Sequence, residues 1–167
     1  MSILVLIYVI AERLLELVIA HGNTRRLLAR GAREAGAAHY PFMVALHAGW
    51  LAAIVAWVML TPASYSPAFL VLYGLLQVLR IWVMVSLGPY WTTRIITLAD
   101  TPLVKHGPYK YFRHPNYVVV VLEVVTLPLV FGAWHIAVIF SVLNAGMLWV
   151  RIRAENHALS ARGPAAS

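Results

Sequence analysis

Long apolar segments alternate along the chain with short polar ones. Five apolar runs approach the roughly 20 residues that a membrane-spanning helix needs. They are Ser2–Ala20, Phe42–Leu60, Ala68–Leu87, Tyr117–Phe131 and Ala133–Val150. The fourth run is β-branched, but an open strand would leave backbone groups unpaired in lipid, so a helix is expected there too. The pattern predicts an all-α integral membrane bundle of about five transmembrane helices.

The last two runs are separated by little more than Gly132, and they predict a tight helical hairpin. The fourth run has about 15 residues, which at about 1.5 Å per residue gives roughly 22 Å. A bilayer's hydrocarbon core is roughly 30 Å thick. The hairpin is therefore expected to be either tilted or partly re-entrant.

Composition supports a membrane protein, because 62% of the residues are hydrophobic and only 11% are charged. Soluble domains average about 45–50% apolar and about 25% charged residues. The chain has no cysteine, which excludes disulfides and cysteine-ligated metal sites. The length suits one transmembrane domain over residues 1–160, and the polar end 161–167 is predicted to be a disordered tail.

The net charge of +7 would suggest a nucleic-acid partner in a soluble protein. Here 11 of the 13 basic residues fall in segment 21–40, segment 88–116 and the C-terminal tail, while the alternate connections carry no charge. The positive-inside rule makes the basic side cytoplasmic. The predicted partners are therefore membrane lipids rather than nucleic acid. We expect a multi-pass bacterial inner-membrane protein with its N-terminus outside and its C-terminus in the cytoplasm.

Charged residues inside the apolar runs are expensive in lipid and usually face protein or a wet cavity. Glu12 and Glu16 lie one helical turn apart, and Arg13 can pair with Glu16. We expect an ion pair that joins this first helix to Arg80 of the third. The alternative is that these residues line an ion path.

Glu123 has no ionic partner nearby in the sequence, and a lone buried carboxylate must be paired or protonated. The candidate partners are Arg113, Arg151 and Arg153. In the second run, His47 is expected to be a hydrogen-bonded core residue.

Two polar clusters are predicted to lie at the same membrane depth: residues 105–117, before the fourth helix, and 151–157, at the end of the fifth. The first can be a surface loop with basic residues on phospholipid head groups. The second has Arg151 and Glu155 four residues apart, hence on one helical face. Together the clusters suit a cytoplasmic pocket for a zwitterionic, nucleoside-bearing cofactor that meets a membrane-dissolved substrate.

Other chemistries find no signature in the chain. It has no GxGxxG motif for a dinucleotide, no HExxH motif for a metal, no GxSxG motif and no P-loop. No metal site is predicted.

The pattern GPYxxxRHPxY, starting at Gly107, is followed one hairpin later by RIxxE, starting at Arg151. In these motifs the sequence resembles the isoprenylcysteine carboxyl methyltransferase family, which consists of integral membrane methyltransferases that use S-adenosylmethionine. Three upstream blocks resemble a short bacterial branch that includes alkylpyrone and alkylresorcinol O-methyltransferases: residues 34–36, 39–41 and 90–94.

The resemblance implies a cytoplasmic site for S-adenosylmethionine, and for its product S-adenosylhomocysteine, in about residues 88–159. The implied cofactor-binding residues are Lys105, His106, Gly107, Tyr109, His114, Pro115, Tyr117, Glu155 and Asn156. Asn156 stands where the family commonly has a second glutamate, so it can donate a hydrogen bond but supplies no charge.

The implied catalytic residues are Arg113, His114, Arg151 and Glu155. An arginine would orient a carboxylate acceptor or lower the pKa of a hydroxyl, and the histidine or glutamate would take the hydroxyl proton. The acceptor's lipid tail is expected to enter along the face shared by the second, third and fourth helices.

The leading hypothesis is an O-methyltransferase for a lipophilic acceptor of the alkylpyrone or alkylresorcinol type. The alternative within the class is a prenylcysteine carboxyl methyltransferase. The competing class is a non-catalytic membrane scaffold or transporter subunit.

Overall fold

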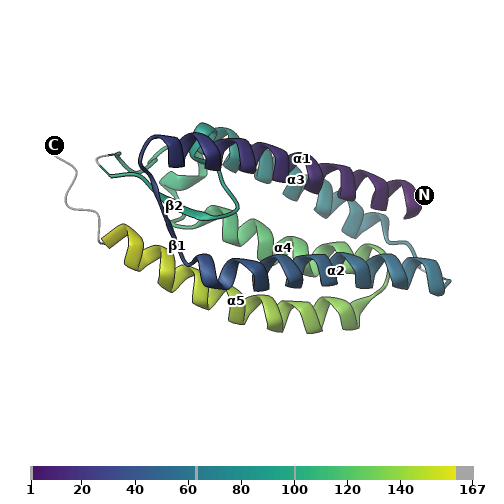
Figure 1. Cartoon of the computed structure of the whole chain (residues 1–167). Coiled ribbons are helices and arrows are strands. Elements are labelled where there is room, and N and C mark those ends of the chain that lie inside the picture. Colours follow the sequence, from purple (N-terminus) through teal and green to yellow (C-terminus); the bar gives the residue numbers. More distant parts are fainter. Residues whose placement is uncertain (1, 63, 100, 161–167) are drawn as a thin grey trace.

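The computed structural model describes residues 2–62, 64–99 and 101–160. Five α-helices in these ranges form a bundle (Figure 1). They are α1 Ser2–Ala29, α2 Tyr40–Leu60, α3 Pro67–Leu87, α4 Pro115–Val130 and α5 Trp134–Ser160. The predicted all-α bundle is confirmed. The predicted disordered tail, 161–167, lies outside the described residues.

Three helical segments are long and apolar enough to cross a membrane, namely Ala37–Leu60, Pro67–Tyr90 and Trp134–Ser160. Helix α4 has 16 residues, or about 24 Å at about 1.5 Å per residue. That is short of a hydrocarbon core of roughly 30 Å. The protein is thus a membrane protein in which one helix is shorter than the bilayer is thick.

Helix α1 extends nine residues beyond the predicted apolar run, because the end of apolarity is not the end of a helix. Leucines and arginines in the extra turns are good helix formers. The helix stops at Gly31, whose φ of +85° is left-handed. The N–H of Ala32 then donates to the Leu27 carbonyl at 3.1 Å, which closes the helix end.

Helices α4 and α5 form the predicted hairpin, and α3 packs against α4. The connection turns at Gly132, where φ is +68°. The indole of Trp57 on α2 donates to the carbonyl of Phe131 at 3.0 Å, which joins the hairpin to its neighbour. Buried Ile54, Leu127 and Phe131 belong to the apolar core at this end of the bundle.

A two-stranded antiparallel sheet, which the sequence analysis did not predict, joins two distant connections. Strand β1, Arg33–Ala35, follows α1 and pairs with β2, Ile95–Thr97, which follows α3. The sheet lies at the end of the bundle where α5 ends, opposite the end where α1 begins (Figure 1). The three basic segments therefore share one end of the bundle, while the orientation of that end in a membrane stays a prediction.

Charged residues from three helices meet inside the bundle. The guanidinium of Arg80, on α3, lies 3.3 Å from a carboxylate oxygen of Glu16, on α1. Arg13 lies 2.8 Å from the same carboxylate and 3.2 Å from that of Glu123, on α4. The predicted ion pair between α1 and Arg80 is confirmed.

The predicted partners of Glu123 were wrong. Its carboxylate accepts two hydrogen bonds from Arg80 and one, at 2.9 Å, from the amide of Gln77. Helix α3 packs directly against α4, so its polar residues reach Glu123. Arg113, Arg151 and Arg153 form no ion pair with it. The partner of Glu123 depends on which helices are neighbours, and the sequence does not show that.

Candidate active site

A cavity of about 810 Å³ lies between α1, α2, α4, α5 and the connection from α3 to α4. This volume falls in the range of small-molecule sites, about 300–1,000 Å³. Eight of the predicted site residues line it, and they come from both predicted polar clusters: Lys105, Tyr109, Arg113, His114, Tyr117, Arg151, Glu155 and Asn156. The structure thus brings the two clusters together.

Three predicted cofactor residues do not line the cavity. His106 is exposed, and Pro115 is buried at the first position of α4. Gly107 has a φ of +57°, and a Cβ built there would lie 2.2 Å from the hydroxyl oxygen of Ser86. These residues shape the turn before α4 and its packing on α3, while the nearby Tyr109 and Asn116 line the cavity.

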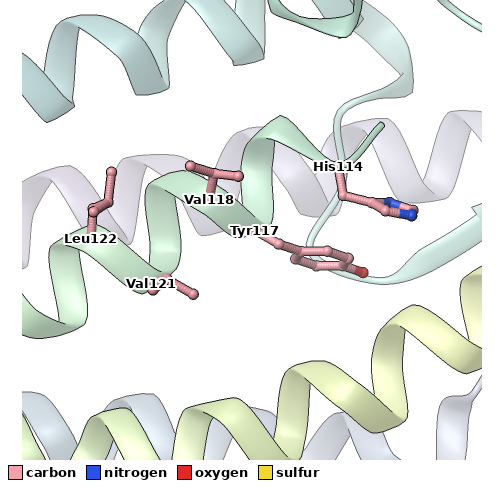
Figure 2. A pocket seen from close by; sticks show the side chains of 5 residues that line it. All are labelled: His114, Tyr117, Val118, Val121 and Leu122. Carbon is pink, nitrogen blue, oxygen red and sulfur yellow. The ribbon is translucent and has the colours of Figure 1, made fainter. Parts of the chain in front are cut away.

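Glu155 is the point where α4 and α5 meet at the site. The hydroxyl of Tyr117 donates to one of its carboxylate oxygens at 2.5 Å. Nδ1 of His114 lies 3.5 Å from the other. The two rings stack with centroids 5.5 Å apart, and Figure 2 shows them side by side where α4 begins. They also border a shallower hollow along α4 (Figure 2).

Arg151 lies one turn before Glu155 on the same wall of the cavity and is 5% exposed. It donates to the carbonyl of Thr93 at 3.0 Å. The hydroxyl of Thr93 in turn lies 3.1 Å from that of Tyr40, at the start of α2. The guanidinium is therefore held in place by the connection that leads into β2.

Tyr109 faces the cavity from the single 3₁₀ turn Gly107–Lys110. Burial raises the pKa of its phenol above the ordinary value, and the negative charge of Glu155 raises it further. The side chain stays a neutral phenol at physiological pH. It can donate a hydrogen bond to a ligand in the cavity.

The sequence analysis assigned no site role to residues 92–98, which line the cavity around β2. Arg94 forms an ion pair with Glu34 at 2.7 Å and stacks on the ring of Tyr40, with its guanidinium carbon 4.2 Å from the centroid. The upstream blocks that resemble the short bacterial branch contain all three residues. That resemblance was the available signal for these residues in the sequence. In the structure the blocks meet because β1 pairs with β2.

The cavity gives little support to the expected route for the acceptor tail along the face shared by α2, α3 and α4. Helix α3 contributes only Arg80 and Leu87 to the cavity lining, because most of its inner face packs on α4. Among the helices, α1 and α2 contribute most of the apolar lining. Leu14, Leu17 and Val44 line the cavity and are among the exposed apolar residues of α1 and α2. The cavity therefore reaches the lipid-facing surface between α1 and α2.

Comparisons with known proteins agree with the resemblance seen in the motifs. A family model described as "Isoprenylcysteine carboxyl methyltransferase (ICMT) family" matches residues 68–161. A Bacillus subtilis (strain 168) protein described as "Uncharacterized protein YpbQ" is 38% identical over 159 residues, which cover 93% of this chain and 95% of that protein.

A more distant relative from Haemophilus influenzae (strain Rd), described as "Uncharacterized protein", is 24% identical over 156 residues, 91% of each chain. No solved structure matches the chain significantly. The family match covers more than half of the sequence and includes the hairpin and both motifs. The chain therefore belongs to the isoprenylcysteine carboxyl methyltransferase family, whose members are membrane methyltransferases that use S-adenosylmethionine.

Proposed function

We propose that the protein transfers a methyl group from S-adenosylmethionine to a hydroxyl of a lipophilic acceptor dissolved in the membrane. Alkylpyrones and alkylresorcinols are the leading acceptor class, from the resemblance of the upstream blocks. The observation that carries the proposal is the cavity itself. Its polar end lies between the two motifs, and its apolar end reaches the lipid between α1 and α2.

The polar end has the donor set for a zwitterionic nucleoside. Buried amide oxygens of Asn116 and Asn156 and the indole nitrogen of Trp91 have no hydrogen-bond partner among the described residues, and all three residues line the cavity. They can bind hydroxyls, amines and ring nitrogens. Lys105 and Arg113 add cations for a carboxylate. These residues fit S-adenosylmethionine.

The basic end of the bundle is, in this proposal, the cytoplasmic side of a bacterial inner membrane. The positive-inside rule and a water-soluble methyl donor both support that orientation. The N-terminus is then outside. Accessibility labelling of single cysteines placed at Thr61 and Arg30 tests this, because the chain has no cysteine of its own. Labelling of Arg30→Cys from the outside would contradict it.

S-adenosylmethionine, when bound, supplies a methyl group on a positively charged sulfur. The chain must then hold the acceptor oxygen in line with that methyl, at about 3–3.5 Å, and exclude water. Arg151 is buried and held by Thr93, so it presents a fixed cation that orients the acceptor oxygen and lowers the pKa of its hydroxyl. As the new O–C bond replaces the C–S bond, the hydroxyl proton must leave.

In this proposal His114 takes that proton. Its Nδ1 faces Glu155 at 3.5 Å. A carboxylate there favours a proton on Nδ1, which leaves a lone pair on Nε2. That Nε2 atom is buried, and no group in the described ranges bonds it. A carboxylate acceptor needs no base, so this arrangement supports a hydroxyl acceptor over a prenylcysteine carboxylate.

The test is transfer of a labelled methyl group by purified protein in detergent. The acceptors are an alkylresorcinol, an alkylpyrone and farnesylcysteine. His114→Gln should lower transfer to a hydroxyl about 10²–10⁴-fold, the usual contribution of general base catalysis. S-adenosylhomocysteine should still bind with little change. The matched control is His157→Gln, because His157 is exposed on α5 and does not line the cavity.

Each alternative has its own signature in this experiment. Transfer to farnesylcysteine alone, with no loss in His114→Gln, would favour carboxyl methylation. A folded protein that binds no S-adenosylhomocysteine would favour the scaffold or transporter subunit. If Glu155→Ala and Arg151→Ala keep full activity, the site itself is misassigned.

A further inference from the structure

The cavity has polar atoms well below its cytoplasmic end, among residues that face hydrocarbon. Asn144, on α5, is 1% exposed, and its amide oxygen has no hydrogen-bond partner within the described part of the chain. Trp50, on α2, is 5% exposed, and the described residues likewise offer its indole nitrogen no partner. Both side chains line the cavity.

His47 adds a third polar atom from α2. Its Nδ1 lies 2.9 Å from the carbonyl of Met43, one turn earlier. A carbonyl only accepts, so Nδ1 must donate, and this leaves the lone pair of a neutral ring on Nε2. His47 also lines the cavity. The expected hydrogen bond is thus confirmed, although His47 is half-buried and lines the cavity rather than the core, and the bond fixes the remaining nitrogen as an acceptor.

These side chains lie at similar depth in the bundle. Gly49 of α2 lies against the ring of Phe140 of α5, and the two helices run antiparallel. Toward the cytoplasmic end, Asn144 lies four residues from Phe140 along α5, and His47 lies two residues from Gly49 along α2. Their levels differ by about 3 Å at about 1.5 Å per residue. Trp50 is less than one turn deeper than His47.

This level is separate from the one where the methyl group is transferred. Asn144 precedes Arg151 by seven residues on the same helix, a rise of about 10 Å. Seven residues are two turns, so both side chains face the same way. An aromatic ring that carries two oxygens, each hydrogen-bonded to one of these two levels, spans a distance of this order.

A buried polar atom without a hydrogen-bond partner is costly, and on a cavity wall its partner must come from what enters the cavity. The neighbours of Asn144 along α5 are mostly apolar, so an apolar residue would serve packing better. A buried amide with a free oxygen next to a cavity indicates a ligand atom. The amide can accept from a hydroxyl or donate to a carbonyl, while the Trp50 N–H only donates.

We propose that Asn144, with His47 and Trp50, binds a second oxygen of the methyl acceptor inside the membrane. The inference rests on the proposed function and narrows its substrate class. The acceptor is then a ring that carries one oxygen for methylation and another, a hydroxyl or carbonyl, directed toward α2 and α5. A prenylcysteine carboxylate places both of its oxygens at one end and would leave only hydrocarbon at this level.

The test compares two acceptors with the same tail, a pentadecylresorcinol and a meta-pentadecylphenol, which lacks the second oxygen. The measurement is kcat/KM for labelled methyl transfer. Wild type should favour the resorcinol by at least about tenfold, because the phenol leaves buried polar groups unpaired. Asn144→Leu should reduce the preference to less than about threefold by slowing transfer to the resorcinol. His47→Phe, a second variant, should reduce it as well.

Ser141→Ala is the matched control. Ser141 is also a polar residue on α5 whose hydroxyl has no partner in the described ranges, but it does not line the cavity. It should keep the wild-type preference. S-adenosylhomocysteine binding, measured on each variant, reports whether the site is folded.

The outcomes separate this inference from the proposed function. Equal kcat/KM values for the two acceptors in wild type would overturn the inference alone. So would an unchanged preference in both Asn144→Leu and His47→Phe. If wild type binds S-adenosylhomocysteine but methylates neither of these acceptors nor the alkylpyrone, the proposed function fails, and the inference fails with it.

Discussion

Arg80 is expected to stabilise the bundle more than any exposed ion pair does. Its side chain is 6% exposed, and its guanidinium contacts two carboxylates on two other helices. Arg80→Leu removes two bonds to Glu123 and two contacts with Glu16, at 3.3 and 3.5 Å. At about 0.6 kcal/mol for each polar contact in a membrane protein, the loss is at least about 2 kcal/mol.

The variant also changes the charge balance of the cluster. Three glutamates, Glu12, Glu16 and Glu123, would then share the single cation of Arg13. Removing one partner of a buried pair costs about 3–5 kcal/mol, because the other charge stays buried. The expected loss in the free energy of unfolding is therefore about 2–5 kcal/mol.

The assay is equilibrium unfolding in mixed detergent and SDS micelles, followed by tryptophan fluorescence. Removing both charges, in Arg80→Leu with Glu123→Leu, should cost less than the sum of the single variants. Glu34→Gln is the control, because it breaks a half-exposed pair with Arg94 and should cost at most about 1 kcal/mol. Strict additivity, or a loss below about 0.5 kcal/mol for Arg80→Leu, would refute the reasoning.

Three further predictions concern the polar end of the bundle. Gly107→Ala should lower stability by about 1–2 kcal/mol, since a left-handed φ and the contact with Ser86 both oppose a methyl group, and thermal unfolding measures the loss. Absorbance titration, with Tyr109→Phe as reference, should show the Tyr109 phenol ionising above its ordinary value near 10. Because folding raises the pKa of Tyr109, the neutral phenol stabilises the protein fully at a pH below the pKa of the unfolded state, and this stabilisation is lost as pH rises through the pKa of the folded state. A Tyr109 titration at the ordinary value would contradict this prediction. Asn23→Leu should destabilise the protein by about 1–3 kcal/mol in the same unfolding assay, because it leaves two backbone carbonyls, of Gly88 and Trp91, without their amide donor; an unchanged midpoint would show that water replaces the amide.

The sequence determined which segments are helices and where the two motifs lie on them. Hydrocarbon admits almost no alternative to a helix, so an apolar run of sufficient length fixes the element type. The same constraint made helix four helical despite its β-branched residues. Spacing alone also placed Arg151 and Glu155 on one face. The apolar pattern located the end of α1 poorly, because α1 continues past the last apolar residues and ends just before Gly31, whose φ is left-handed.

Only the tertiary structure decided which helices are neighbours, and the site depends on that. Glu123 pairs with Arg80 rather than with an arginine of α5, because α3 packs against α4. The cavity reaches lipid between α1 and α2 for the same reason. Lipid is as apolar as the helix surfaces, so an apolar pattern does not distinguish a face that meets lipid from one that meets another helix. The depth shared by His47 and Asn144 likewise follows from the contact between α2 and α5, which no local pattern encodes.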